Sequence, residues 1–253
     1  MSLQSDFKEI AQTGGRAALV TVVAGGDAAL GAKLLVRADG EASGSLGSRE
    51  RDELALAHAE ELMWAERSEL RGDLFVDVVA PPPRLIVFGA VDFAAALCRM
   101  ASAAGWRPFV VDPRGRFATR ERFPDAEDVV VAWPEKAFAQ LGGIDRATYI
   151  AVLTHDPKLD DAALTAALAA EPAYIGAMGS RRAQERRRER LLGAGVPEDQ
   201  LARVAAPIGL DLGGLTAEET ALSIMAEVVA VRNGREGGRL SAAGAGRIHE
   251  VGT

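Results

Sequence analysis

A turn rich in glycine and arginine carries the clearest chemistry in this sequence. Gly176 and Gly179 interrupt an apolar run, and Ser180 is a residue type that caps helices. The first N–H groups of a helix lack partners and attract anions, and Arg181 and Arg182 add fixed positive charge at that point. The spacing therefore predicts an anion-binding turn at the start of a helix.

More arginines follow along the same segment, interleaved with Glu185 and Glu189. This mixture of charges is typical of a solvated helix face. Replacement of Arg187 by alanine is accordingly expected to change little. The arginines that we assign to the solvated face are Arg186, Arg187, Arg188 and Arg190.

A second candidate turn follows the apolar run 84–90 and contains Gly89 and Ala90. A dinucleotide-binding turn carries a second glycine that lets the backbone approach a pyrophosphate, but Val91 stands at that position. A β-branched side chain would crowd a phosphate there. The pattern favours a Rossmann topology with an altered way of holding its ligand over a standard NAD(P) site.

Two further strand ends carry polar groups. Asp112 lies where an acidic residue contacts a ribose hydroxyl in nucleotide-binding folds, but an Asp before proline also forms turns. Arg114 is placed to meet a phosphate. His155 could donate a hydrogen bond or move a proton, or it could be a structural residue of a loop.

Cys98 lies inside an apolar helical segment and is interpreted as a small core residue.

The elements that position these residues belong to an α/β protein. Three consecutive prolines at 81–83 predict a linker between an N-terminal α+β domain, 1–80, and a Rossmann-like doubly wound parallel sheet, 84–232, followed by a flexible tail, 233–253. Apolar runs predict N-terminal strands over 18–24, 32–36, 42–46 and 74–80 and helices over 3–12 and 50–70.

After the prolines, strands and helices alternate. The predicted strands cover 84–90, 108–112, 129–133, 148–153 and 173–178, and the predicted helices cover 92–104, 134–141, 158–170 and 180–192. The last helix begins at a capping box of Thr216 and Glu219, and its apolar stripe comprises Ala221, Ile224, Met225, Val228 and Val229.

Composition excludes several classes of protein. The net charge of −7 argues against a nucleic-acid binder. A single cysteine and three histidines far apart in sequence argue against a protein-held metal. There is no signal-peptide pattern and no apolar run of about 20 residues, so we expect a cytoplasmic protein that does not enter a membrane.

Several blocks of the sequence together resemble the XdhC/CoxI family. The C-terminal half carries the more specific blocks, Gly179-Ser180-Arg181-Arg182 and Pro207-Ile208-Gly209-Leu210-Asp211. Further matching stretches are Asp112-Pro113-Arg114, Arg122-Phe123-Pro124-Asp125-Ala126, Thr154-His155-Asp156, Tyr174-Ile175-Gly176, 216–224 with Glu227, and, more weakly, 31–36 with Asp39-Gly40 and Gly44-Ser45.

This resemblance implies a maturation factor that binds the molybdenum cofactor, as molybdopterin or its cytosine dinucleotide. Such a factor assists the sulfuration of the cofactor and its delivery to a xanthine-dehydrogenase-like or CO-dehydrogenase-like molybdenum hydroxylase. It implies a homodimer, a cysteine desulfurase as a further partner, and Asp211 as part of the site. It would bind cofactor without turnover. Two alternatives stay open: an FAD- or NAD(P)-binding redox protein, and a docking module that binds no ligand.

Overall fold

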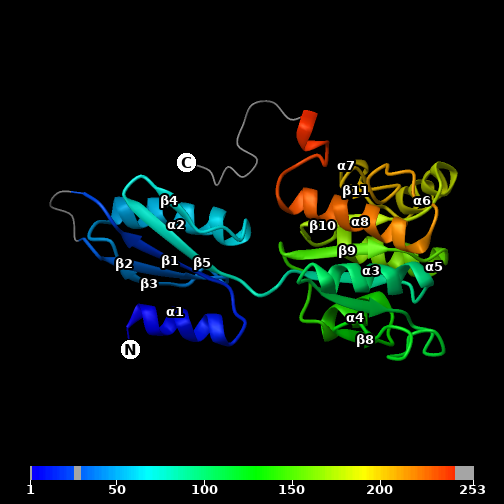
Figure 1. Cartoon of the computed structure of the whole chain (residues 1–253), viewed down its shortest axis with the longest axis horizontal. Helices are drawn as coiled ribbons and strands as arrows, with labels where there is room; N and C mark the ends of the chain where they lie inside the picture. Colours follow the sequence, from blue (N-terminus) through cyan, green and yellow to red (C-terminus); the bar gives the residue numbers. More distant parts are fainter. Residues whose placement is uncertain (1, 26–29, 243–253) are drawn as a thin grey trace. The chain divides into compact units, whose positions relative to one another are not determined.

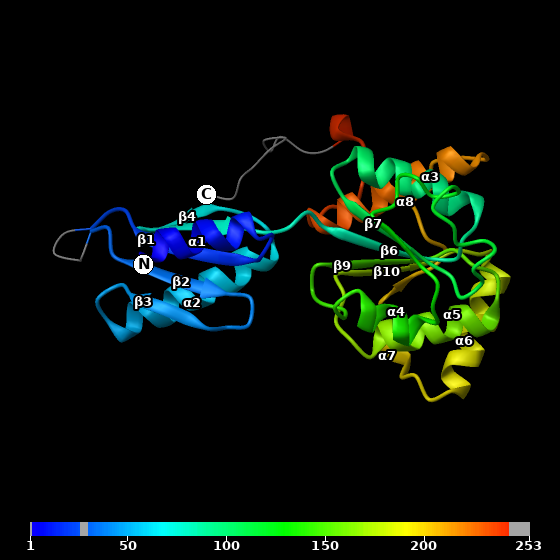
Figure 2. The same cartoon turned by 90° about the horizontal axis from the view of Figure 1, so that it is seen from below.

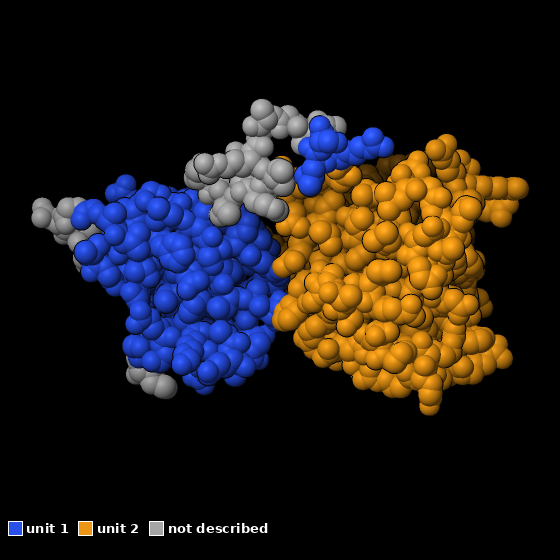
Figure 3. All heavy atoms as spheres, viewed as in Figure 1, with its two compact units in different colours: residues 1–81, 239–253 blue, residues 82–238 orange. Residues whose placement is uncertain are grey.

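The computed structural model describes residues 2–25 and 30–242. The chain divides between Pro81 and Pro82 into two compact units, and residues 239–242 are grouped with the first of them (Figure 3). The predicted tail begins at Asn233, which caps the last helix, and a short 3₁₀ turn follows at Leu240–Ala242. The remainder of that predicted tail, 243–253, lies outside the described residues.

The first unit is an antiparallel five-stranded sheet with a helix on each face (Figure 1). The order is β3-β2-β1-β5-β4. Its elements are α1 (Leu3–Gln12), β1 (Ala17–Val22), β2 (Lys33–Arg37), β3 (Ala42–Ser45), α2 (Arg49–Trp64), β4 (Glu69–Arg71) and β5 (Leu74–Val79). Alternate residues of β1 point to opposite helices: Leu19 packs with Phe7 of α1, and Val20 packs with Leu62 of α2.

The helix predicted over 50–70 is too long. The α2 helix ends at Trp64, and Glu69–Arg71 forms the edge strand β4. The chain leaves the helix through Glu66, which has a φ of 53°. Glu66 accepts a hydrogen bond from Arg16 at 2.7 Å, and Arg16 also donates to the Met63 carbonyl at 2.8 Å. A contact with a residue some fifty positions earlier thus accompanies the end of the helix, and local propensity does not reveal it.

The second unit is a parallel six-stranded sheet of the expected doubly wound class. Its strands are β6 (Arg84–Phe88), β7 (Arg107–Val111), β8 (Asp128–Val130), β9 (Thr148–Val152), β10 (Tyr174–Ala177) and β11 (Val204–Ala205). Its helices are α3 (Asp92–Ala103), α4 (Pro134–Gln140), α5 (Pro157–Leu168), α6 (Arg181–Gly193), α7 (Glu198–Leu201) and α8 (Ala217–Arg232). The sequence did not predict the short elements α7 and β11.

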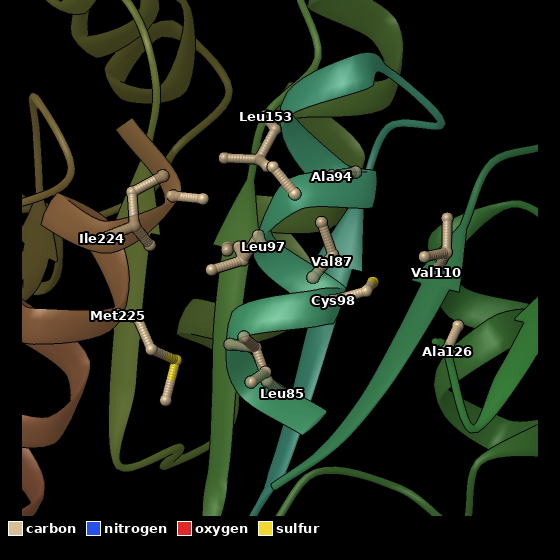
Figure 4. Packing of buried hydrophobic residues seen from close by; sticks show 14 of the residues in the cluster. Leu85, Val87, Ala94, Leu97, Cys98, Val110, Ala126, Leu153, Ile224 and Met225 are labelled. Carbon is tan, nitrogen blue, oxygen red and sulfur yellow. The ribbon is translucent and has the colours of Figure 1, made fainter. Parts of the chain in front are cut away.

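Helices cover both faces of this sheet, which explains its continuous apolar strands. Figure 2 shows α3 and α8 on one face and α4, α5 and α6 on the other. Within β6, Leu85 and Val87 face α3 and α8, whereas Ile86 and Phe88 face the opposite helices. Figure 4 shows the first of these cores, where side chains of α3 and α8 such as Leu97 meet β6.

The last helix begins as expected. The Thr216 hydroxyl accepts from the Glu219 N–H at 3.1 Å, and the Glu219 carboxylate accepts from the Thr216 N–H at 3.1 Å, which completes the capping box. The predicted apolar stripe is wrong at one position. Val229 is 38% exposed, because the face of α8 that packs on the sheet ends at Val228.

We propose that the proline segment 81–83 links two separately folded domains. Limited proteolysis of the native protein should then cut first near these prolines or within the tail, because exposed connecting segments are preferred cleavage sites. The cut sites would be located by mass spectrometry of the early fragments. Early cleavage inside 84–111 would contradict the proposal, because this stretch contains two buried strands of the parallel sheet.

Candidate functional site

The strand order places the site candidates. The sheet runs β11-β10-β9-β6-β7-β8, so the direction of winding reverses between β6 and β9. In open parallel sheets, ligands bind beyond the carboxyl ends of the strands at such a reversal. Gly89 and Ala90 follow β6, and His155 follows β9, so these residues lie at the reversal itself. Asp112 follows β7 and Gly179 follows β10, each one strand away.

Gly89 is required by the protein's own packing. It has a φ of +108°, and a Cβ at this position would lie 3.0 Å from the Thr154 backbone nitrogen and 3.0 Å from the Thr154 Cβ. Only glycine tolerates both this backbone conformation and this close approach. Gly89 therefore lets the ends of β6 and β9 lie against each other.

Asp112 is fully buried and bonded on both oxygens. Oδ1 accepts from the backbone N–H and from Nε of Arg114, both at 2.9 Å. Oδ2 accepts from the Ala90 N–H at 2.9 Å and from Arg114 Nη2 at 2.7 Å. Burial alone would raise the pKa of Asp112, but the hydrogen bonds from Arg114 and Ala90 hold that pKa below its ordinary value. The carboxylate thus joins the turns after β6 and β7.

The hydrogen bonds of Asp112 compete with the ribose contact that the sequence suggested for this residue. The side chain has no exposed surface in this structure, and its four accepted hydrogen bonds come from its own chain. A ribose hydroxyl would have to replace one of them. The exposed member of this pair is Arg114, whose side chain is 40% exposed. Its guanidinium carbon lies 5.0 Å from the centroid of the Phe117 ring.

A residue that the sequence analysis did not place in the site lies at the turn after β6. Arg122 donates through Nη1 to the Ala90 carbonyl at 2.9 Å and through Nη2 to Asp92 at 3.1 Å. The α3 helix begins here with Val91 as its N-cap, which makes no side-chain capping bond. The signal available in the sequence was the block Arg122 to Ala126, which we used only for the family resemblance.

The turn after β9 is held by its neighbours in sequence. The Asp156 N–H donates to the Thr154 hydroxyl at 2.8 Å, and the Asp156 carboxylate caps α5 by accepting from the Lys158 N–H at 3.0 Å. His155 stands between these two residues in the sequence and is exposed. Asp211 is also exposed, in the segment that follows β11. The neighbouring Leu210 is held by its N–H bond to the Ser223 carbonyl of α8 at 3.2 Å.

The turn after β10 presents its polar residues to solvent. Ser180 is the N-cap of α6, and its hydroxyl accepts from the Ala183 N–H at 3.3 Å. Arg181 and Arg182 are exposed in the first turn of that helix. Gly176 is buried within β10, where a Cβ would lie 2.4 Å from the Tyr174 hydroxyl. Gly176 therefore serves packing, whereas Ser180, Arg181 and Arg182 are available to a ligand.

The assignment of Arg187 to a solvated face is wrong. Arg187 is only 5% exposed, and its Nη2 pairs with the buried Asp160 carboxylate of α5 at 2.7 Å. The cause is the packing of α6 against α5, which turns this position of the arginine-rich helix inward. Arg190 likewise pairs with Asp161 at 2.7 Å. Arg186 is exposed, as expected for a solvated face.

Cys98 is a core residue without exposed surface (Figure 4). Burial, with a smaller contribution from Asp125, raises the pKa of its thiol to about 12, so it is protonated and unreactive at neutral pH. Cys98→Ser should therefore leave ligand binding unchanged and cost roughly 1–3 kcal/mol of stability for a buried hydroxyl without a partner. Calorimetric titration and thermal unfolding of the purified variant test this. Loss of binding in a folded variant would contradict it.

Among the described residues, no three His, Cys, Asp or Glu side chains are grouped as metal ligands. Within the same part of the chain, no helix is long and apolar enough to cross a membrane. At the carboxyl edge of the parallel sheet, Arg114 and Arg122 are held by hydrogen bonds, and Arg181 and Arg182 are exposed at the N-terminus of α6.

Fold and site together define a Rossmann-type α/β protein with an additional antiparallel unit. A model of the XdhC Rossmann domain matches residues 85–228, and a model of the XdhC and CoxI family matches residues 10–72. The chain therefore belongs to the XdhC and CoxI family, and the resemblance drawn from the sequence blocks is confirmed.

Curated relatives give more detail. A protein of Bacillus subtilis (strain 168) that is named as a probable xanthine dehydrogenase subunit is 29% identical over 160 residues, which are 63% of this chain and 46% of that protein. The molybdenum cofactor insertion chaperone PaoD of Escherichia coli (strain K12) is 30% identical over 152 residues, 60% of this chain and 41% of that protein. The chain spans less than half the length of these relatives.

A solved structure supports the fold. A xanthine dehydrogenase from Bacillus halodurans aligns with a TM-score of 0.62 at 24% sequence identity. The alignment covers 89% of this chain and 65% of that one.

Proposed function

We propose that this protein binds the molybdenum cofactor, as molybdopterin or its cytosine dinucleotide, and assists its sulfuration and insertion into a molybdenum hydroxylase. The observation that carries the proposal is the family match over both units, with a relative named as a molybdenum cofactor insertion chaperone. The client would be an enzyme of the xanthine dehydrogenase or CO dehydrogenase type. The cofactor is cargo in this role, so binding and release suffice and no turnover is required.

The residues at the carboxyl edge fit a ligand that carries phosphate. Arg181 and Arg182 are exposed beside the N-terminus of α6, where helix dipole and unpaired N–H groups favour an anion. The Arg114 guanidinium is fixed by Asp112 and partly exposed. We propose that the phosphate binds at the α6 turn, with His155 contributing from the end of the neighbouring strand β9. The rest of the ligand would extend along the carboxyl edge of the sheet toward Arg114, which follows β7.

A standard NAD(P) or FAD site is the less favoured alternative. In a dinucleotide-binding turn the backbone N–H groups after the first glycine face the pyrophosphate. Here the Ala90 N–H donates to Asp112, and the Val91 N–H donates to the Gly89 carbonyl at 2.9 Å. Two of the donors that such a site uses are thus bonded within the protein.

The absorption and fluorescence of the purified protein separate the alternatives. A fluorescent pterin released by acid and oxidation, in molar amount comparable to the protein, is the expected result. The visible absorption band of oxidised flavin would favour a redox protein instead, and neither signal after expression with molybdate would favour a docking module. A homodimer and a cysteine desulfurase partner stay predictions of the family resemblance, and a cytoplasmic location stays a prediction of the sequence pattern.

A further inference from the structure

A buried polar network lies beneath the turn that follows β10. From α6, Gln184 Nε2 donates to the carbonyls of Ala177 and Gly179, both at 3.1 Å. Arg187 Nη2 donates to the intervening Met178 carbonyl at 3.0 Å. Three successive carbonyls at the end of β10 are therefore held by two side chains of the helix that the turn begins.

The network extends to the neighbouring helix α5. Arg187 Nη1 donates to the Gln184 side-chain oxygen, and Arg187 Nη2 pairs with Asp160 of α5. Arg187 and Asp160 are 5% and 3% exposed. Gln184 is thereby fixed with its Nε2 toward the turn, because its oxygen is bonded to the buried guanidinium.

The planar geometry of the peptide bond means that these carbonyl bonds also orient the N–H groups of the turn. In a trans peptide the carbonyl of one residue and the N–H of the next point in opposite directions. Since the carbonyls of Met178 and Gly179 point toward the network, the N–H groups of Gly179 and Ser180 point away from it. Neither of these two N–H groups has an acceptor among residues 2–25 and 30–242. They lie directly before the exposed Arg181.

We infer that Gln184 and Arg187 are positioning residues, which hold the turn after β10 so that the Gly179 and Ser180 N–H groups face an incoming phosphate. The inference rests on the proposed function, because it takes this turn as the phosphate site. Neither side chain touches the ligand. Their contribution is to remove the conformational freedom that the turn would otherwise lose on binding.

Gln184→Met tests the inference, because methionine keeps the length of the side chain and removes both donated bonds. Gln200→Met in α7 is the matched control, since the carbonyls of Ala177 and Gly179 accept from the Gln184 side chain and Gln200 lies in a different helix. The first measurement is amide hydrogen exchange of the peptide that covers 178–183. The second is the affinity for inorganic pyrophosphate by titration calorimetry. Arg181→Ala is measured in parallel.

The expected result is faster exchange in this peptide and about five- to tenfold weaker pyrophosphate binding in Gln184→Met, with neither change in Gln200→Met. Unchanged exchange overturns the inference. Faster exchange with unchanged affinity also overturns it. If Arg181→Ala weakens binding in that case, the turn binds the anion without needing its orientation; if Arg181→Ala binds as the wild type does, the anion does not bind at this turn. If the wild type does not bind pyrophosphate, the phosphate site of the proposed function is wrong and the inference falls with it.

Discussion

Arg187→Ala should lower the free energy of unfolding by roughly 3–5 kcal/mol, the usual consequence of removing one partner of a buried ion pair. Asp160 and Arg187 are almost without solvent contact, so the variant would keep a charged carboxylate that neither water nor a cation stabilises. The Met178 carbonyl would lose a donor as well. Denaturant unfolding followed by circular dichroism measures the loss.

A second substitution separates the effect of the unpaired Asp160 charge from the effect of the lost packing. Asp160→Asn in the Arg187→Ala background removes the charge, so the double variant should recover part of the stability. Arg186→Ala, one position earlier and exposed, is the control and should change stability by less than about 0.5 kcal/mol. A loss for Arg187→Ala no larger than for Arg186→Ala would contradict the buried pair.

The loss should also depend on pH. Burial raises the pKa of Asp160 above its ordinary value even with Arg187 beside it, and without Arg187 that pKa should rise further. A carboxyl with a raised pKa binds more protons in the folded than in the unfolded protein, so stability falls as the pH rises above the ordinary pKa. Arg187→Ala should therefore lose more stability near pH 8 than at about pH 5.

Arg181→Ala should weaken the binding of a phosphate-bearing ligand about tenfold or more. A hydrogen bond to a charged group contributes about 1.5–3 kcal/mol, and about 1.4 kcal/mol corresponds to a factor of ten. The unfolding temperature should stay close to that of the wild type, because Arg181 is exposed and no packing depends on it. Titration calorimetry with the cofactor or with inorganic pyrophosphate gives the affinity.

Arg186→Ala is again the suitable control, because it removes the same charge from the same helix but outside its first turn. Its affinity should be close to that of the wild type. Equal affinities for wild type and Arg181→Ala would remove the turn after β10 from the binding site. The main physical argument for a phosphate-bearing ligand at that turn would then be lost.

The sequence predicted most elements because their signals are local. Apolar runs bounded by glycine and proline predicted the parallel strands, and the capping box at Thr216 placed the start of α8. The Asp39-Gly40 pair is typical of hairpin turns and stands between the predicted strands 32–36 and 42–46, and the sheet pairs Val36 with Ala42 as such a hairpin requires. Each of these signals concerns residues close together in the chain, where spacing alone specifies geometry.

Only the tertiary structure decided which polar residues are buried. Arg187 and Arg186 are adjacent arginines of one charged run, and nothing in the sequence distinguishes them. In the structure, Arg187 pairs with Asp160, which is 27 positions away. The position of Asp112 after a strand made it a candidate for a ribose contact, but the Ala90 N–H and Arg114 occupy both its oxygens in the structure. Charged residues are tolerated inside only where a partner from another element meets them, and that meeting depends on how helices and strands pack. The sequence thus determined the family, the fold class and the turns, and packing determined which side chains remain free for a ligand.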